Sequence, residues 1–113
     1  MLRVPDAQVG EVEKVLASHA AWMPETHRGP SGPNPLIYTI TKTSEFNYPL
    51  DPSEGTSGFT LIALIEIYNG KDGCQAHLDI TDSWKDFPDM MEKVVPHQVG
   101  MMMFGGVIGS MED

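Results

Sequence analysis

A chain of 113 residues, 41% of them apolar, has room for one domain with its own hydrophobic core and none for a second. Sixteen acidic and seven basic side chains give a formal net charge of −9, which repels nucleic-acid phosphates and anionic lipid, so we expect no nucleic-acid partner and no membrane association. The single cysteine, Cys74, excludes an internal disulfide, and no secretion signal opens the chain, which favours a reduced, cytoplasmic protein.

The first residues predict a short strand followed by a helix. Leu2 and Val4 fit an edge strand that Pro5 ends, because proline lacks the backbone N–H. Asp6 stands where an N-cap belongs, and Pro24 is expected to stop or kink the helix. Between them, apolar residues recur every three or four positions, which predicts one buried helix face: Val9, Val12, Leu16, Ala20 and Met23.

A neighbouring row on the same helix carries His19 and Trp22, and these side chains could line a pocket. The alternative is that Trp22 lies at the edge of the core and that His19 interacts with the negative end of the helix dipole. His27 begins a segment rich in glycine and proline, residues 27–35, which predicts a loop with an exposed histidine.

Two strands and a long connection follow. Residues 36–46 have strand composition, and residues 59–68 are apolar on both faces except for Glu66. Such a strand is expected to be covered on both sides, and to pair with residues 36–46 as an antiparallel hairpin. The polar residues 47–58 between them predict a long connection, either mobile or a functional flap.

The last third predicts helices and a final strand. Residues 74–78 form a short helix with His77, and a second helix starts near Thr81 or Asp82, with Pro88 interrupting it. The acidic row along this region fits a solvated helix face better than a calcium loop, because it lacks the oxygen-ligand pattern of that motif. Residues 98–110 predict a last strand, apolar on both faces, whose consecutive methionines suit a ligand pocket or a subunit contact.

This order of elements corresponds to the α+β class and to the ferredoxin-like split βαβ plan, with an antiparallel sheet, helices on one face and a short or absent first strand. Because two strands are apolar on both faces, the second face needs a cover. A two-fold partner supplies one economically, so we expect a homodimer.

Three stretches resemble a known family. They are Ile65–Tyr68 at the end of a strand, Gln75–Leu78 in the following helix and Trp84–Phe87 in the next. Together they resemble the dimeric α/β-barrel superfamily, in particular the antibiotic biosynthesis monooxygenase group. The resemblance implies a dimeric α/β barrel and a cofactor-independent monooxygenase that acts on a small phenol or quinol.

The chain departs from the family at its beginning. Family members open with a full first strand, whereas only residues 1–4 precede the first helix here. Haem-degrading relatives use an asparagine of that strand, and this chain has no counterpart, so haem degradation is not expected.

His77 is the candidate base for such chemistry, because an imidazole titrates near neutral pH, and Glu66 would orient it. Alternatively, His77 bonds a loop carbonyl, and Glu66 is a satisfied carboxylate at a sheet edge or subunit contact. Six further residues are candidates for walls of a substrate pocket or are ordinary core: Trp22, Tyr38, Tyr68, Trp84, Phe87 and Met102.

We expect no metal and no cofactor, because the histidines lack characteristic ligand spacing, and Cys74 has no identifiable catalytic triad. The alternative function is a non-catalytic homodimer that binds a small aromatic or apolar ligand, or a domain whose only partner is itself.

Overall fold

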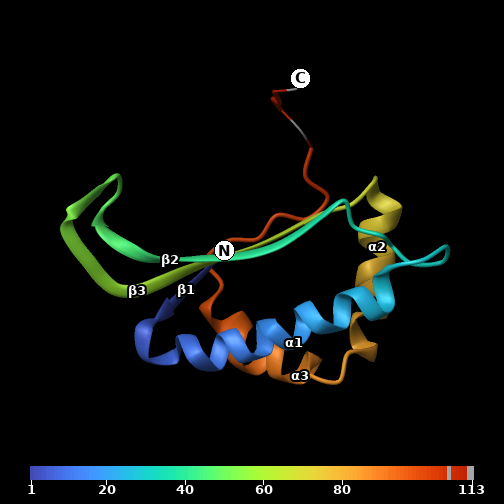
Figure 1. Ribbon diagram of the computed structural model, residues 1–113, viewed down its shortest axis with the longest axis horizontal. Coiled ribbons are helices and arrows are strands. Elements are labelled where there is room, and N and C mark those ends of the chain that lie inside the picture. Colours follow the sequence, from blue (N-terminus) through green and yellow to red (C-terminus); the bar gives the residue numbers. More distant parts are fainter. Residues whose placement is uncertain (107, 112–113) are drawn as a thin grey trace.

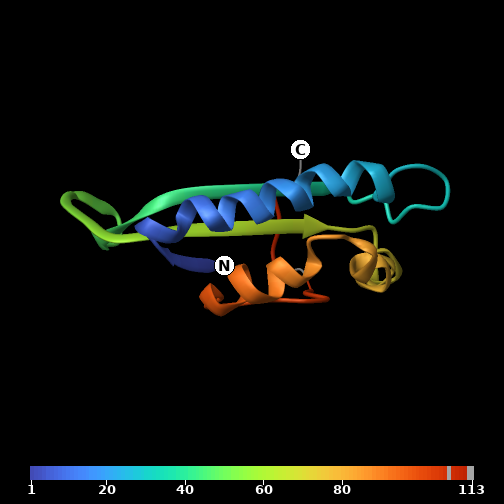
Figure 2. The ribbon, with the colours of Figure 1, turned by 90° about the horizontal axis from the view of Figure 1, so that it is seen from below.

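A computed structural model describes residues 1–106 and 108–111 of the chain. It has an α+β architecture, in which a three-stranded antiparallel sheet is covered by helices on one face (Figure 1). The strand order is β1 (Leu2–Pro5), β3 (Asp51–Ile67), β2 (Ile37–Tyr48). Seen from below, α1 (Val9–His27) and the helical segment that begins with α3 (Phe87–Asp89) lie side by side across the sheet (Figure 2).

The expected first helix is confirmed, but its ends differ from the prediction. Asp6 is not the N-cap; it lies in a 3-10 turn, and its carboxylate accepts a hydrogen bond of 2.8 Å from Thr60 Oγ1. Pro24 does not stop the helix, which continues to His27. Pro24 removes one backbone hydrogen bond from the last turn of the helix. Burial of His27, which is 1% exposed, stabilises that turn and offsets the loss.

The central hairpin is confirmed, and it is longer than predicted. Register partners run from Ile37 with Ile67 to Tyr48 with Asp51, so the expected long connection at residues 47–58 is wrong. The register shifts near Phe46, and this irregularity lets the polar ends of the two strands pair. Gly55 contributes as well, because its φ of 83° is a conformation that glycine adopts readily. The sequence did not predict this pairing, because strands are usually rich in β-branched and aromatic residues and this segment is rich in glycine and polar residues.

Helices cover one face of β3, and the other face is exposed. Ile62 is 1% exposed and points at the helices, whereas Ile65 and Ile67 point the other way and are 45% and 44% exposed. The core therefore lies on the helix side only. It consists of Leu2, Val4, Val12, Val15, Leu16, Trp22, Met23, Ile62, Trp84 and Val94.

In the C-terminal third, the predicted short helix at residues 74–78 is confirmed and is longer than expected, whereas the second predicted helix is replaced by several short helical segments. After α2 (Lys71–Ile80) and a 3-10 turn, α3 leads into a π-turn at Met90–Val94 and a 3-10 turn at Val95–His97. Pro88 lies in the first turn of α3, where proline is tolerated. Among the described residues, no helix is both long enough and apolar enough to cross a membrane.

The predicted last strand is wrong for the described residues. Gln98 forms a single bridge with Leu2, and Met1 bonds the backbone of Val99 and Gly100. Residues 101–106 and 108–111 then leave the sheet and are exposed. A four-residue β1 offers few free backbone groups, so an apolar pattern alone cannot extend the sheet there.

Candidate functional site

A cluster of polar side chains lies under one end of the sheet, where α1 ends and α2 packs against β3. We call it the histidine cluster, and it consists of His19, His27, Tyr38, Glu66, Tyr68 and His77. Tyr38 and Glu66 are register partners on the helix-facing side of β2 and β3. His19 and His27 are eight residues apart on α1, about two helical turns, so they share one face. The fold therefore gathers residues that are distant in sequence.

Two glycines bring α2 against this end of the sheet. Gly70 has a φ of 95°, a left-handed conformation that lets the chain turn sharply after β3. A Cβ at Gly73 would lie 3.1 Å from Cβ of Tyr68, a tight contact that a larger residue could make only if Tyr68 shifted by a few tenths of an ångström. The approach places His77, 7% exposed, beside Glu66 and His27.

The hydrogen bonds of Thr26 determine which nitrogen of His27 carries a proton. The Thr26 hydroxyl donates to the Trp22 carbonyl at 3.0 Å, so it can only accept from Nδ1 of His27, 2.7 Å away. A neutral His27 protonated at Nδ1 has a free lone pair on Nε2. That atom lies 2.6 Å from Nδ1 of His77, which must therefore be the donor.

The same argument leaves a free lone pair on Nε2 of His77. This nitrogen faces Oε1 of Glu66 at 3.6 Å, and Oε1 already accepts a hydrogen bond of 2.9 Å from the Tyr68 hydroxyl. Two electron-rich atoms thus face each other in a buried space. The imidazole nitrogen and the carboxylate oxygen can therefore share a proton or bind a cation.

His19 completes the cluster from α1. Its Nδ1 lies 2.6 Å from the hydroxyl of Tyr38. Ligand atoms of His19, Glu66 and His77 all lie within 4.8 Å of one another. Sequence spacing missed this convergence, because the three residues come from three different elements. The available signal was the alternation along the hairpin, which puts Tyr38 and Glu66 on one face.

Burial controls protonation in the cluster. It lowers the pKa of His19 to about 4, aided by the nearby His77 and His27. It also lowers the pKa of His27 to about 4, aided by His77 and partly opposed by a hydrogen bond to the Met23 backbone. Burial lowers the pKa of His77 and raises that of Glu66, although the Tyr68 hydrogen bond acts against the latter shift.

The two tyrosines stay protonated. Burial, with Glu66 nearby, raises the pKa of Tyr38 and of Tyr68 well above the ordinary phenol value. At neutral pH the cluster therefore contains three uncharged imidazoles and two phenol groups around one carboxyl group.

Aromatic rings surround the cluster. Trp22 and Trp84 stack with centroids 6.0 Å apart, and Trp84 meets His19 edge-on at 5.1 Å. The indole of Trp84 donates to Ser18 Oγ at 3.1 Å. The ring of Tyr68 stacks on His77 at 5.7 Å.

The structure thus brings six of the eight predicted site residues together: Trp22, Tyr38, Glu66, Tyr68, His77 and Trp84. Phe87 packs half-buried against the core, and Met102 is 81% exposed on the C-terminal segment. His19, which was expected either to line a pocket with Trp22 or to interact with the helix dipole, joins the cluster, and so does His27, which was not a predicted site residue. The expectation of an exposed His27 is wrong, because the helix extends past Pro24 and carries this side chain inward.

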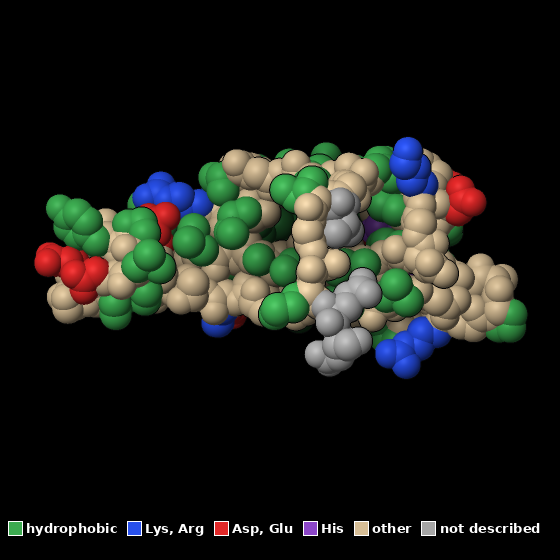
Figure 3. All heavy atoms as spheres, turned by 90° about the horizontal axis from the view of Figure 1, so that it is seen from above, with side chains coloured by type: hydrophobic (Ala, Val, Ile, Leu, Met, Phe, Trp, Pro, Cys, Tyr) green, Lys and Arg blue, Asp and Glu red, His purple; other side chains and the backbone are tan. Residues whose placement is uncertain are grey.

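A cavity of about 530 Å³ adjoins the cluster. His27 and Tyr38 belong to both, and the rest of its wall comes from the end of α1 and residues 34–36. Viewed from the uncovered face of the sheet, a histidine side chain also shows in a hollow (Figure 3). The cluster thus borders space of the size that small ligands occupy.

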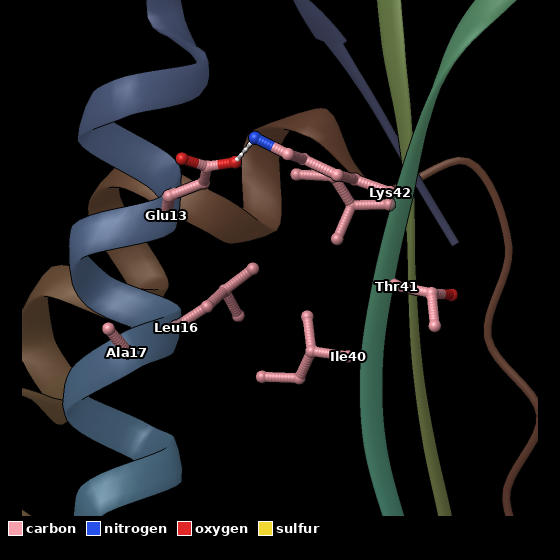
Figure 4. A pocket seen from close by; sticks show the side chains of 7 residues that line it. Glu13, Leu16, Ala17, Ile40, Thr41 and Lys42 are labelled. Atoms are coloured by element: carbon pink, nitrogen blue, oxygen red, sulfur yellow. Dashed lines mark hydrogen bonds and ion pairs between the residues drawn. The ribbon is translucent and has the colours of Figure 1, made fainter.

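A second cavity of about 270 Å³ lies between α1 and β2. Leu16 and Ala17 face Ile40 across it, and Glu13 pairs with Lys42 at one end (Figure 4). Its wall is mostly aliphatic and holds no histidine, so it offers little chemistry.

Fold and site together define a small α+β protein with a buried cluster of histidine, tyrosine and glutamate. Comparisons with protein-family models, curated proteins and solved structures found no match to this chain.

The buried histidines predict a loss of stability in acid. The unfolded chain binds protons at histidine below about pH 6.5, whereas folded His19 and His27 resist protonation until about pH 4. Each such histidine, taken alone, lowers the free energy of unfolding by about 2 kcal/mol between pH 7.5 and pH 5. Glu66 acts in the opposite direction, because its raised pKa lets the folded state take up a proton first.

Because three histidines lower the free energy of unfolding in acid and only Glu66 raises it, we expect the protein to be less stable at pH 5 than at pH 7.5. Urea unfolding in buffer with a chelator should therefore give a clearly lower midpoint at pH 5 than at pH 7.5. The His97→Gln variant, changed outside the cluster, should show the same difference. Equal midpoints at the two pH values would contradict the buried, neutral state of these histidines.

Proposed function

We propose that the chain is one subunit of a ferredoxin-like dimeric α/β barrel. The strand order β1-β3-β2 supports this, as does the bridge from Gln98 to the free edge of β1, where a fourth strand would lie. Hydrophobic side chains gather on the face of the sheet that no helix covers (Figure 3). Among them Ile37, Ile65 and Ile67 are 44% to 49% exposed, and a second copy of the same face would bury them.

The proposed dimer predicts that a charge on this face separates the subunits. Ile65→Lys is expected to shift the mass measured by analytical ultracentrifugation from dimer to monomer, because a buried, unpaired ammonium group is costly. Leu50→Lys is the matched control, since Leu50 is 98% exposed at the hairpin tip. A wild-type chain that stays monomeric at high concentration would refute the dimer.

We further propose that the histidine cluster is the reactive centre of a cofactor-independent monooxygenase for a small phenol or quinol. The observation that carries this proposal is the distance of 3.6 Å between Nε2 of His77 and Oε1 of Glu66 among aromatic rings, where the hydrogen bonds from Thr26 through His27 leave Nε2 as an acceptor. A substrate in the adjoining cavity would reach it past Tyr38 and His27.

In the proposed reaction, Nε2 of His77 takes the proton of the substrate hydroxyl, and Glu66 stabilises the imidazolium that forms. The electron-rich phenolate reduces dioxygen, and a carbon–oxygen bond forms on the ring. Loss of the ring proton at that carbon breaks the oxygen–oxygen bond. For a simple phenol, one oxygen atom becomes a quinone carbonyl and the other leaves as water, with the proton returned by His77.

The test is oxygen consumption by the purified, metal-free protein with a panel of phenols and quinols. At least one should be consumed above its autoxidation rate, with one dioxygen per substrate and a quinone as product. No turnover across the panel would count against the proposal.

The alternative is a homodimer that binds a small aromatic or apolar ligand without turnover. The packing of the cluster favours it in one respect, since His77 is only 7% exposed and the cavity wall includes neither His77 nor Glu66. Saturable binding of a panel compound without oxygen consumption would support this alternative.

A further inference from the structure

His19, Glu66 and His77 offer two imidazole nitrogens and one carboxylate oxygen within 4.8 Å of one another. A tetrahedral ion about 2.1 Å from two ligand atoms holds them about 3.4 Å apart. The pair of Nε2 in His77 and Oε1 in Glu66, 3.6 Å apart, already has this spacing. His19 has a ring nitrogen within 4.8 Å of both atoms, so binding an ion requires His19 to move closer to this pair.

The proton positions also fit a cation. A metal ligand must present a lone pair, and the chain from Thr26 through His27 leaves one on Nε2 of His77. On His19, a proton at Nδ1 can be donated to the Tyr38 oxygen, which leaves the lone pair on Nε2. The two histidines are buried, with His19 3% exposed and His77 7%, and the side chain of Glu66 is 17% exposed.

Each of these groups is held by a second residue, as ligands of metal sites usually are. Nε2 of His27 accepts a hydrogen bond from the Nδ1–H of His77, and the Tyr68 hydroxyl donates to Glu66 at 2.9 Å. Tyr38 contacts His19 at 2.6 Å.

We propose that His19, Glu66 and His77 bind one divalent transition-metal ion of the Zn²⁺ type. Two imidazoles and one carboxylate suit such ions and not Ca²⁺ or Mg²⁺, which prefer oxygen ligands. Three protein ligands leave a fourth position for water or a small molecule. This site does not rest on the proposed oxygenase. It competes with base catalysis, because Nε2 of His77 cannot hold a metal ion and accept a substrate proton together.

The test uses tag-free protein stripped with a chelator and titrated with Zn²⁺ alone, in competition with a chromophoric chelator. We expect one equivalent to bind and the melting temperature to rise with it. Co²⁺ in its place should give the intense visible bands of a four-coordinate site. The His77→Gln and Glu66→Gln variants should each bind Zn²⁺ at least 100-fold more weakly, whereas His97→Gln should bind like the wild type.

Tyr68→Phe keeps all three ligands and removes only the hydrogen bond to Glu66. It should bind Zn²⁺ about 10-fold more weakly, the usual effect of removing such a supporting contact, and it remains informative if a ligand variant fails to fold. Absence of one-to-one binding in the wild type would overturn the site, and so would equal loss in His97→Gln. Oxygen consumption only by metal-loaded protein would refute the cofactor-free reaction and leave the metal site standing.

Discussion

The His77→Gln variant is expected to lower kcat/KM for oxygen consumption by about 10²- to 10⁴-fold, the usual contribution of a positioned general base. Glutamine has a similar size and keeps a polar end next to His27 and Glu66, so the cluster should stay packed. It cannot accept a proton at neutral pH, because its terminal nitrogen is an amide. The loss should therefore appear in turnover and not in folding.

The measurement is the initial rate of oxygen uptake with the best compound of the panel, in buffer with a chelator. His97→Gln is the control, since His97 lies outside the cluster. Glu66→Gln should give a smaller loss than His77→Gln, because Glu66 stabilises the imidazolium without taking the substrate proton. Wild-type turnover by His77→Gln would remove His77 as the base.

The Trp84→Ala variant is expected to lose about 3–5 kcal/mol in free energy of unfolding. Trp84 is 2% exposed, stacks on Trp22 and closes the cluster against His19. Its removal leaves a large cavity and frees Ser18 from the indole hydrogen bond. Urea or thermal unfolding monitored by circular dichroism measures the change.

Two further variants separate packing from hydrogen bonding at this position. Trp84→Phe keeps an aromatic ring but loses the donor to Ser18, so we expect it to be less destabilised than Trp84→Ala. Leu50→Ala, changed at a side chain that is 98% exposed, should stay within about 0.5 kcal/mol of the wild type. An unchanged Trp84→Ala would mean that this tryptophan is a pocket wall and not part of the core.

Local pattern determined the parts of the fold whose periodicity is strong. The stripe from Val9 to Met23 predicted α1, and the apolar residues 59–67 predicted the central strand and its antiparallel partner. Such elements can be read from sequence because one helix face or strand face repeats at a fixed interval. Pattern failed at residues 47–58, because their glycine and polar residues do not look like a strand, and at residues 98–110, because pairing there depends on which strand edge is available.

The candidate site was predictable only in part. His77 and Glu66 were paired by their nearness in sequence, across a single turn. His19 was a pocket candidate but was not linked to His77, and His27 was expected in a loop, because Pro24 suggested that the helix would end before it. His27 is buried where it bonds His77 of α2 and contacts the Trp22 ring, with ring centroids 4.9 Å apart.

The sequence by itself thus determined an α+β chain, its long helix, its hairpin and one polar pair at the end of β3. Only the tertiary structure decided that three histidines, two tyrosines and Glu66 share one buried space, and that Nε2 of His77 keeps its lone pair. The physical reason is that burial and hydrogen-bond direction are properties of neighbours in space. These neighbours come from α1, the β2–β3 hairpin, the turn after it and α2, and local sequence patterns do not predict contacts between separate elements.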